Sequence, residues 1–87
     1  MFSEIFQLVP KFLHMEGLED FKIKLGLKIK TLREAKDLTQ GKLGDLIEKD
    51  YQAISRLERG LVNPSVYLVL QIANALEVKI EDLLLFD

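Results

Sequence analysis

Hydrophobic residues recur at three- and four-residue steps along almost the whole chain, which places them on one face of successive helices. No window shows the sustained alternation and enrichment in β-branched residues that are typical of strands. We therefore predict an all-α fold. The first apolar stripe consists of Phe2, Ile5, Phe6, Val9, Phe12 and Leu13. Pro10 interrupts this stripe, so we expect a kink or two short helical pieces there.

Cap and turn residues divide the remaining chain into five helices. The predicted ranges are 21–36, 40–47, 51–59, 66–76 and 80–86. Thr39 and Asp50 are preferred N-cap residues for the second and third of these helices. Asn63-Pro64-Ser65 is a turn and cap signal before the fourth. Gly60 follows the third helix, where a helix C-terminus favours a residue with positive φ.

The same spacing predicts which side chains form the core. The inward-facing residues are Phe21, Leu25, Ile29, Leu32, Leu43, Leu46, Ile47, Ile54 and Leu57. The helix over residues 66–76 is apolar on nearly every side, so we expect it to be the most buried element. Gly44 is expected where helices 40–47 and 51–59 cross, because a side chain larger than a methyl would push them apart.

Composition bounds the class of protein. With 87 residues, 48% of them hydrophobic and 30% charged, the chain has room for one domain with a modest core. We assign residues 1–20 to an N-terminal amphipathic arm or extra helix and residues 21–87 to the domain. The chain has no cysteine, a single histidine (His14) and dispersed carboxylates, so we expect no metal site, no cofactor and no enzymatic activity. No apolar run reaches the roughly 18 to 20 residues of a membrane span, so we expect a soluble, cytoplasmic protein.

The formal net charge of −2 by itself argues mildly against nucleic-acid binding and for a protein partner. The charge is, however, unevenly distributed. Residues 1–21 sum to −3, residues 22–59 sum to +4 from ten bases and six acids, and residues 60–87 sum to −3. A basic middle therefore lies between two acidic ends.

Inside this basic middle, two short helices meet at the tight turn Glu48-Lys49-Asp50, which is the arrangement of a helix-turn-helix. The run LREAKDLTQGKLGDLIEKDYQAISRLERG, residues 32–60, resembles the helix-turn-helix of the phage-repressor type, the Cro/cI or XRE family. The similarity continues through Asn63-Pro64-Ser65, residues 71–78 and residues 80–84, and it covers residues 22–86. It implies a five-helix, lambda-repressor-like DNA-binding domain from a prokaryote or a phage.

The outer face of the helix over residues 51–59 is the candidate DNA-reading surface, because Ile54 and Leu57 face inward. The outward residues are Tyr51, Gln52, Ser55 and Arg56. A glutamine pairs with an adenine edge, an arginine with a guanine edge and a serine with either, while a tyrosine contacts phosphate or a thymine methyl. We therefore predict that these four residues contact bases.

The resemblance implies that Gln40 grips a DNA phosphate and braces the start of the recognition helix, with help from helix N-terminal amides. The other candidate phosphate contacts are Lys42, Lys49, Arg59, Asn63, Ser65 and Tyr67. Leu61 and Val62 are apolar where many relatives are polar or basic.

Arg33 and Glu58 match an ion pair that is buried beneath the motif in the family. The chain departs from the family at three helix ends, where relatives often carry glycine. The residues at these ends are Asp37, Glu48 and Glu77. Aspartate tolerates the left-handed conformation fairly well and glutamate does so less readily. Either the two glutamate ends close differently or a small backbone strain is accepted. Lys79 also replaces the usual small polar cap of the last helix.

A single recognition helix reads only a few base pairs, so family members usually bind as two-fold dimers with half-sites about 34 Å apart. The chain offers two candidate dimer surfaces. One is the C-terminal cluster Leu83, Leu84, Leu85 and Phe86, and the other is the N-terminal stripe, with Phe2, Ile5, Phe6 and Val9. The N-terminal stripe has two further possible roles, folding back on its own core or binding a protein partner through residues 1–14.

We expect a small homodimeric transcriptional repressor that binds a partly symmetric operator in double-stranded DNA. One alternative keeps the fold and DNA binding but makes the protein an antitoxin or a restriction-modification controller. Another is a protein-interaction module that has lost DNA binding, for which Glu48, Leu61, Val62 and the acidic overall charge argue.

Overall fold

The computed structural model describes residues 17–86, which contain five helices and no strands. The helices are α2 (Leu18–Ala35), α3 (Gln40–Leu46), α4 (Tyr51–Glu58), α5 (Val66–Ala75) and α6 (Ile80–Leu84). The predicted all-α class is confirmed for this part of the chain. The N-terminal stripe of residues 2–13 lies outside the described residues. α2 begins at Leu18, so the boundary predicted between residues 20 and 21 falls inside a helix.

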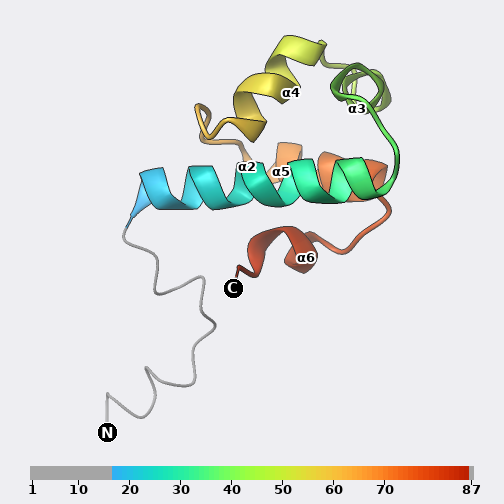
Figure 1. Cartoon of the computed structure of the whole chain (residues 1–87). Coiled ribbons are helices and arrows are strands. Elements are labelled where there is room, and N and C mark those ends of the chain that lie inside the picture. The colour runs from blue at the N-terminus through green and yellow to red at the C-terminus, as the bar shows by residue number, and fades with distance from the viewer. Residues whose placement is uncertain (1–16, 87) are drawn as a thin grey trace, which may run out of the picture.

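The long helix α2 runs across the middle of the domain (Figure 1), with α3 and α4 on one side and α6 on the other. α5 lies behind α2 in this view and joins the two sides. The chain then returns to the beginning of α2, because the rings of Phe21 and Phe86 meet edge to face with centroids 6.1 Å apart. This arrangement leaves α3 and α4 together on one exposed side of the domain.

All five helices contribute to one hydrophobic core, as expected for helices too short to be stable alone. The buried hydrophobic residues are Leu25, Ile29, Leu43, Ile47, Ile54, Leu57, Val69, Ile72, Ala73, Leu76, Leu83 and Phe86. Phe21 and Leu32 pack against this cluster while partly exposed, as predicted. Leu46 was wrongly predicted to face inward, since 59% of it is exposed. The buried face of α3 is set by Leu43, Gly44 and Ile47, and Leu46 lies outside that arc.

The prediction that the fourth helix is the most buried element is also wrong. Val66, Tyr67 and Leu70 of α5 are 78%, 69% and 42% exposed. Val69, Ile72 and Ala73 face the core, whereas nothing among residues 17–86 covers the opposite side of the helix. α5 therefore has a buried face and an apolar exposed face.

The N-caps follow the sequence prediction. The side chains of Thr39, Asp50 and Ser65 accept hydrogen bonds from the third amide of the helices that follow, at 3.0, 2.8 and 3.0 Å. At the start of α6, where Lys79 replaces a small polar cap, the Asp82 carboxylate instead accepts a hydrogen bond from the Lys79 amide at 2.9 Å.

The helices α2, α3, α4 and α5 end in the same way. At each end, the backbone amide of a residue beyond the helix donates a hydrogen bond to the carbonyl oxygen five positions earlier in the chain. The residue before that amide takes a positive φ in each case. These residues are Asp37 (57°), Glu48 (59°), Gly60 (75°) and Glu77 (58°). The three non-glycine helix ends therefore accept the left-handed conformation and its strain. The predicted glycine end at Gly60 is confirmed.

Two glycines sit where helices meet other parts of the backbone. A Cβ on Gly44 would overlap the carbonyl oxygen of Lys49, so even a methyl group does not fit. The constraint comes from the turn rather than from the helix crossing that we predicted. A Cβ on Gly26 would lie 2.6 Å from the backbone oxygens of both Leu57 and Glu58. The close approach at Gly26 was missed by the sequence analysis.

No helix within residues 17–86 has the length and apolar character needed to cross a membrane.

Candidate nucleic-acid interface

The outer face of α4 presents the four residues predicted to contact bases. Tyr51 is 58% exposed, Gln52 and Arg56 are exposed, and Ser55 is half-buried between them. Ile54, Leu57 and Glu58 point into the domain. A rigid helix thus carries four side chains with hydrogen-bonding groups on its solvent side, which is what base readout in a major groove requires. Their contact with DNA stays a prediction.

The angle between α3 and α4 is fixed by the turn that joins them. The Lys49 amide donates to the Gly44 carbonyl at 2.8 Å, and the Asp50 carboxylate caps the first turn of α4. Glu48 takes positive φ in this turn and is exposed. The turn is thus held by the backbone hydrogen bond between Lys49 and Gly44 and by the Asp50 cap.

A buried ion pair anchors the end of α4 to α2. Arg33 Nε donates to Glu58 Oε2 at 2.6 Å, and Arg33 Nη2 donates to Glu58 Oε1 at 2.9 Å. The remaining nitrogen, Nη1, donates to the Leu38 carbonyl at 2.7 Å. Both residues are less than a tenth exposed, and no buried side-chain polar atom among the described residues lacks a partner. The pair is bidentate and fully satisfied, which is the condition for a buried charge to be tolerated.

The hydrogen bond to Glu58 raises the pKa of Arg33 above its already high ordinary value, and outweighs the opposing effect of burial. A raised pKa on a base means that its stabilising contribution is present at lower pH and is lost only as the pH rises through that pKa. The guanidinium is therefore charged over the whole neutral range, and the pair holds α4 in place throughout it.

Gln40 is joined to this ion pair. Its Nε2 donates to Glu58 Oε1 at 3.1 Å. The side chain therefore braces the end of α4, whereas we had predicted that it braces the start of this helix. The amide keeps one hydrogen and its oxygen for another partner. Gln40 is half-buried at the first position of α3.

The other candidate phosphate contacts are distributed around α4. Lys42 and Lys49 are exposed on α3 and in the turn, and Arg59 is exposed just after α4. The loop between α4 and α5 and the first turn of α5 carry Asn63, Ser65 and Tyr67, all exposed. Ser65 already caps α5, since its Oγ accepts from the Leu68 amide. These six residues lie on α3, in the turn before α4, just after α4, in the loop that follows and at the start of α5, and the structure records no hydrogen bond between them.

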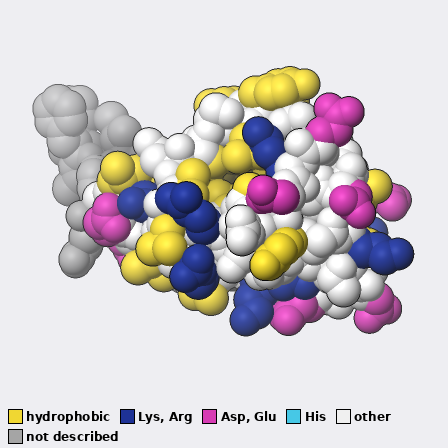
Figure 2. Space-filling view, turned by 90° about the horizontal axis from the view of Figure 1, so that it is seen from above, with side chains coloured by type: hydrophobic (Ala, Val, Ile, Leu, Met, Phe, Trp, Pro, Cys, Tyr) yellow, Lys and Arg dark blue, Asp and Glu magenta, His cyan; other side chains and the backbone are white. Residues whose placement is uncertain are grey.

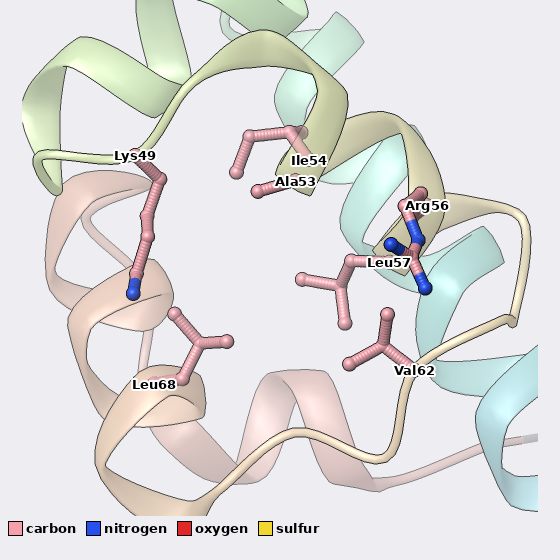
Figure 3. A pocket seen from close by; sticks show the side chains of 7 residues that line it. All are labelled: Lys49, Ala53, Ile54, Arg56, Leu57, Val62 and Leu68. Atoms are coloured by element: carbon pink, nitrogen blue, oxygen red, sulfur yellow. The ribbon is translucent and has the colours of Figure 1, made fainter.

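Figure 3 shows how the loop lies against α4. Lys49 and Arg56 stand on opposite sides of a shallow hollow of about 310 Å³, and Val62 and Leu68 line it from below. Val62 is half-buried against the core, which explains why this loop position is apolar. Leu61 beside it is 52% exposed.

The comparisons with known proteins agree with this geometry. Residues 29–83 match the family model described as Helix-turn-helix, which covers more than half of the chain. The chain belongs to this family, and its domain is of the XRE type. It is 37% identical over 60 residues to an uncharacterized HTH-type transcriptional regulator of Archaeoglobus fulgidus, covering 69% of this chain and 84% of the relative.

Solved structures give the same result. The chain is similar to the restriction-modification controller protein C.AhdI of Aeromonas hydrophila, with 34% identity and a TM-score of 0.68 over 70% of this chain and 92% of the other. It is also similar to the clp gene regulator ClgR of Corynebacterium glutamicum, with 26% identity and a TM-score of 0.71 over 74% and 83% of the two chains. Family and relatives support DNA-binding transcription regulation, in a family that is generally non-enzymatic.

The distribution of charge on this helix-turn-helix differs from the one expected. Residues 39–67 carry four bases and four acids and sum to zero, while residues 22–38 carry six bases and two acids and sum to +4. The positive surplus therefore belongs to α2 and the residues just after it, not to the motif. Figure 2, which views the α3 and α4 side, shows acidic side chains scattered among the basic ones on this face.

The structure adds one basic residue that the sequence analysis missed. Lys30 of α2 lines a surface hollow together with Gln40 and Arg59, and it is exposed. Its sequence position, one helical turn before the buried Arg33, was the available signal. Which of the α2 lysines lies beside the helix-turn-helix is decided by the packing of α2 against α3 and α4.

Proposed function

We propose that this helix-turn-helix protein binds double-stranded DNA as a homodimer, reads a partly symmetric operator with α4, and represses transcription by occupying that operator. The observation that carries the proposal is the outer face of α4, where Tyr51, Gln52 and Arg56 are exposed on a helix whose end is locked by a buried ion pair. A recognition helix must be rigid to discriminate bases, because discrimination requires hydrogen-bond geometry to be held.

Each side chain on this face has a chemically matched target. Gln52 suits an adenine edge, Arg56 suits the two acceptors of a guanine, and Ser55 suits either. Tyr51, at the first position of α4, suits a thymine methyl or a phosphate. The half-site is then a few base pairs long, which is why two copies are needed for useful specificity.

Phosphate contacts are proposed to come from residues on both sides of α4. They are Gln40, Lys42, Lys49, Arg59, Asn63, Ser65 and Tyr67, with Lys30 added from α2. The zero net charge of residues 39–67 predicts weak binding to non-operator DNA, since that binding depends on neutralising phosphates. Affinity for the operator then depends more on base contacts and on dimer geometry.

The dimer surface needs a correction. Leu83 and Phe86, two of the four C-terminal candidates, are 0% and 8% exposed and belong to the core of their own chain. Their side chains therefore offer little surface to a second copy. Phe2, Ile5, Phe6 and Val9 lie outside the described residues.

We therefore place the dimer contact on the exposed face of α5. Val66 and Leu70 lie one turn apart on this face, and Val66 lines an apolar surface hollow of about 320 Å³ together with Leu84 of α6. A two-fold dimer uses the same patch on both subunits, so an exposed apolar face of this kind suits it. Leu85, 46% exposed, lines a different hollow beside α2 and is left outside the contact.

Selection of bound sequences from a random duplex pool, at two salt concentrations, tests the proposal. An enriched motif with two related half-sites is the expected result, with affinity that falls as salt rises. Absence of enrichment at low salt would contradict sequence-specific binding. It would favour a protein-interaction module instead.

A restriction-modification controller is the second candidate, because a protein of that description is 34% identical to this chain over most of its length. This candidate shares the proposed fold and mode of DNA reading. It differs in the genes regulated, so the selected motif would lie ahead of restriction or methyltransferase genes. A motif found only ahead of unrelated genes would contradict it.

A further inference from the structure

The outer surface of α2 carries a short apolar ridge, formed by Ile23 and Leu27. These residues are 50% and 56% exposed, and they lie one turn apart on the same side of the helix. Both line a surface hollow of about 350 Å³, and Leu27 also lines a second hollow of about 300 Å³. A ridge between two hollows is a shape onto which another helix packs, because its side chains fill the hollows and the ridge enters its groove.

Basic side chains line both hollows beside the ridge. They are Lys30 and Arg59 in the first hollow and Lys24 and Lys28 in the second. Lys24 is paired with Asp20 at 3.0 Å, and within residues 17–86 no salt bridge is recorded for the other three. Glu58 is the one acidic residue that lines either hollow, and its charge is compensated by Arg33. The apolar ridge is therefore flanked by positive charge on both sides.

This combination of shape and charge discriminates between possible occupants. A two-fold contact with a second copy would bring the same basic flanks face to face, and like charges across a contact are costly. Duplex DNA supplies negative charge, but a phosphate backbone offers no apolar side chains to cover the ridge. Binding to a lipid surface increases with the apolar area that is buried, and two side chains provide little. A helix that is apolar along one stripe and acidic along both edges satisfies all of these features.

We propose that α2 binds an acidic amphipathic helix of a partner protein, which packs on Ile23 and Leu27. Apolar side chains of the partner fill the two hollows, and its carboxylates face Lys28 on one side and Lys30 and Arg59 on the other. The surface borders the proposed DNA interface at Lys30 and Arg59. The ridge and Lys28 lie outside that interface, so partner binding and DNA binding can each fail without the other.

Binding of a synthetic peptide to the 87-residue chain tests the surface. The peptide is labelled with fluorescein, has about 18 residues so that it can form a helix, and carries leucines at helical spacing with glutamates along both edges. One control peptide replaces the glutamates by lysines, and another replaces the leucines by alanines. Fluorescence anisotropy should detect binding of the first peptide only, and its affinity should fall as salt rises, because apolar contact and opposite charge are both required.

Variants of the protein locate the contact. Leu27→Ala should weaken binding of the acidic peptide by about tenfold, because it removes a central apolar anchor. Leu46→Ala, at a similarly exposed leucine on α3, should leave the affinity unchanged. Lys28→Glu should also weaken binding by about tenfold, whereas Lys36→Glu, at the C-terminal end of α2, should change it by no more than about twofold.

Losses in Leu27→Ala and Lys28→Glu that are absent from their two controls support the proposal. Affinity that is unchanged in both variants would overturn it, and so would equal binding of the lysine peptide or no binding at low salt. Co-sedimentation with vesicles of phosphatidylserine and phosphatidylcholine that is lost in Leu27→Ala would assign the ridge to a lipid surface instead. A mass by light scattering that falls in Leu27→Ala would assign it to a second copy.

Discussion

At the scale of single residues, the proposed function requires that some side chains of α4 hold the helix against the domain while others face solvent. Glu58 and Leu57 hold the helix against α2, and Gln52 and Arg56 face solvent. The Arg33 and Glu58 pair was expected from the resemblance, but its third and fourth partners, the Leu38 carbonyl and Gln40, are seen only in the structure. The pair therefore connects α2, the α2–α3 loop, α3 and α4.

Removal of one partner of this pair is the sharpest stability test. Glu58→Ala should lower the free energy of unfolding by about 3 to 5 kcal/mol, because Arg33 would be left buried and uncompensated. Urea denaturation measures this loss. Glu34→Ala, at an exposed position of the same helix as Arg33, is the control and should change stability by less than about 0.5 kcal/mol. A loss for Glu58→Ala no larger than the control would contradict the role assigned to the pair.

Base and phosphate contacts are expected to respond differently to truncation. Arg56→Ala should weaken binding of the selected operator by about 1 to 3 kcal/mol and relax the preference at one position only. Gln40→Ala should weaken all sequences by a similar factor, because a phosphate contact carries no sequence information. Fluorescence anisotropy on the operator and on single-base variants separates the two. A position-specific effect from Gln40→Ala would assign it to base readout instead.

At the scale of elements, the helix ends show where sequence and structure disagree locally. Three helices end with a non-glycine residue in the left-handed region. Side chains there clash with the following carbonyl, at a cost of about 1 to 2 kcal/mol per residue. From the sequence alone, the ends at Glu48 and Glu77 could either close differently or accept the strain. The hydrogen bonds that satisfy the last carbonyls decide the matter, because they form only with that backbone conformation.

Relief of this strain gives a stabilising mutation. Glu77→Gly should raise the free energy of unfolding by about 1 kcal/mol, since glycine adopts positive φ without the Cβ clash. Thermal and urea unfolding measure the gain. Asn74→Gly, at an exposed position inside α5, is the matched control and should lower stability by about 0.5 to 1 kcal/mol. An equal loss from both variants would show that the end of α5 is not strained.

The closeness of α2 and α4 gives a second prediction at this scale. Gly26→Ala should destabilise the domain by about 1 to 3 kcal/mol, because the new methyl group would overlap the backbone oxygens of Leu57 and Glu58. Gly41→Ala is the control, since its Cβ would have nothing closer than 3.9 Å and alanine is the better helix former. The control should gain about 0.5 to 1 kcal/mol. Equal and small effects at both positions would contradict the close packing.

At the scale of the whole molecule, the proposed dimer contact on the exposed face of α5 would set how two recognition helices are presented to DNA. Val66→Asp should dissociate the proposed dimer, because it places two like charges across a two-fold contact. Light scattering measures the mass, and operator affinity should fall with it. Leu46→Asp, an exposed leucine on α3, is the control and should leave the mass unchanged. A Val66→Asp protein that keeps its dimeric mass would move the contact elsewhere.

The sequence by itself determined the helical class, the five helices within the described residues and most of the core, because these follow from local hydrophobic periodicity. It also determined the caps at Thr39, Asp50 and Ser65, because capping depends on local hydrogen bonding. Only the tertiary structure decided that Leu46 and one face of α5 are exposed, and that Leu83 and Phe86 are internal. It also decided that Lys30 stands beside Gln40. These facts depend on which faces of separate helices meet, and no local pattern contains that information.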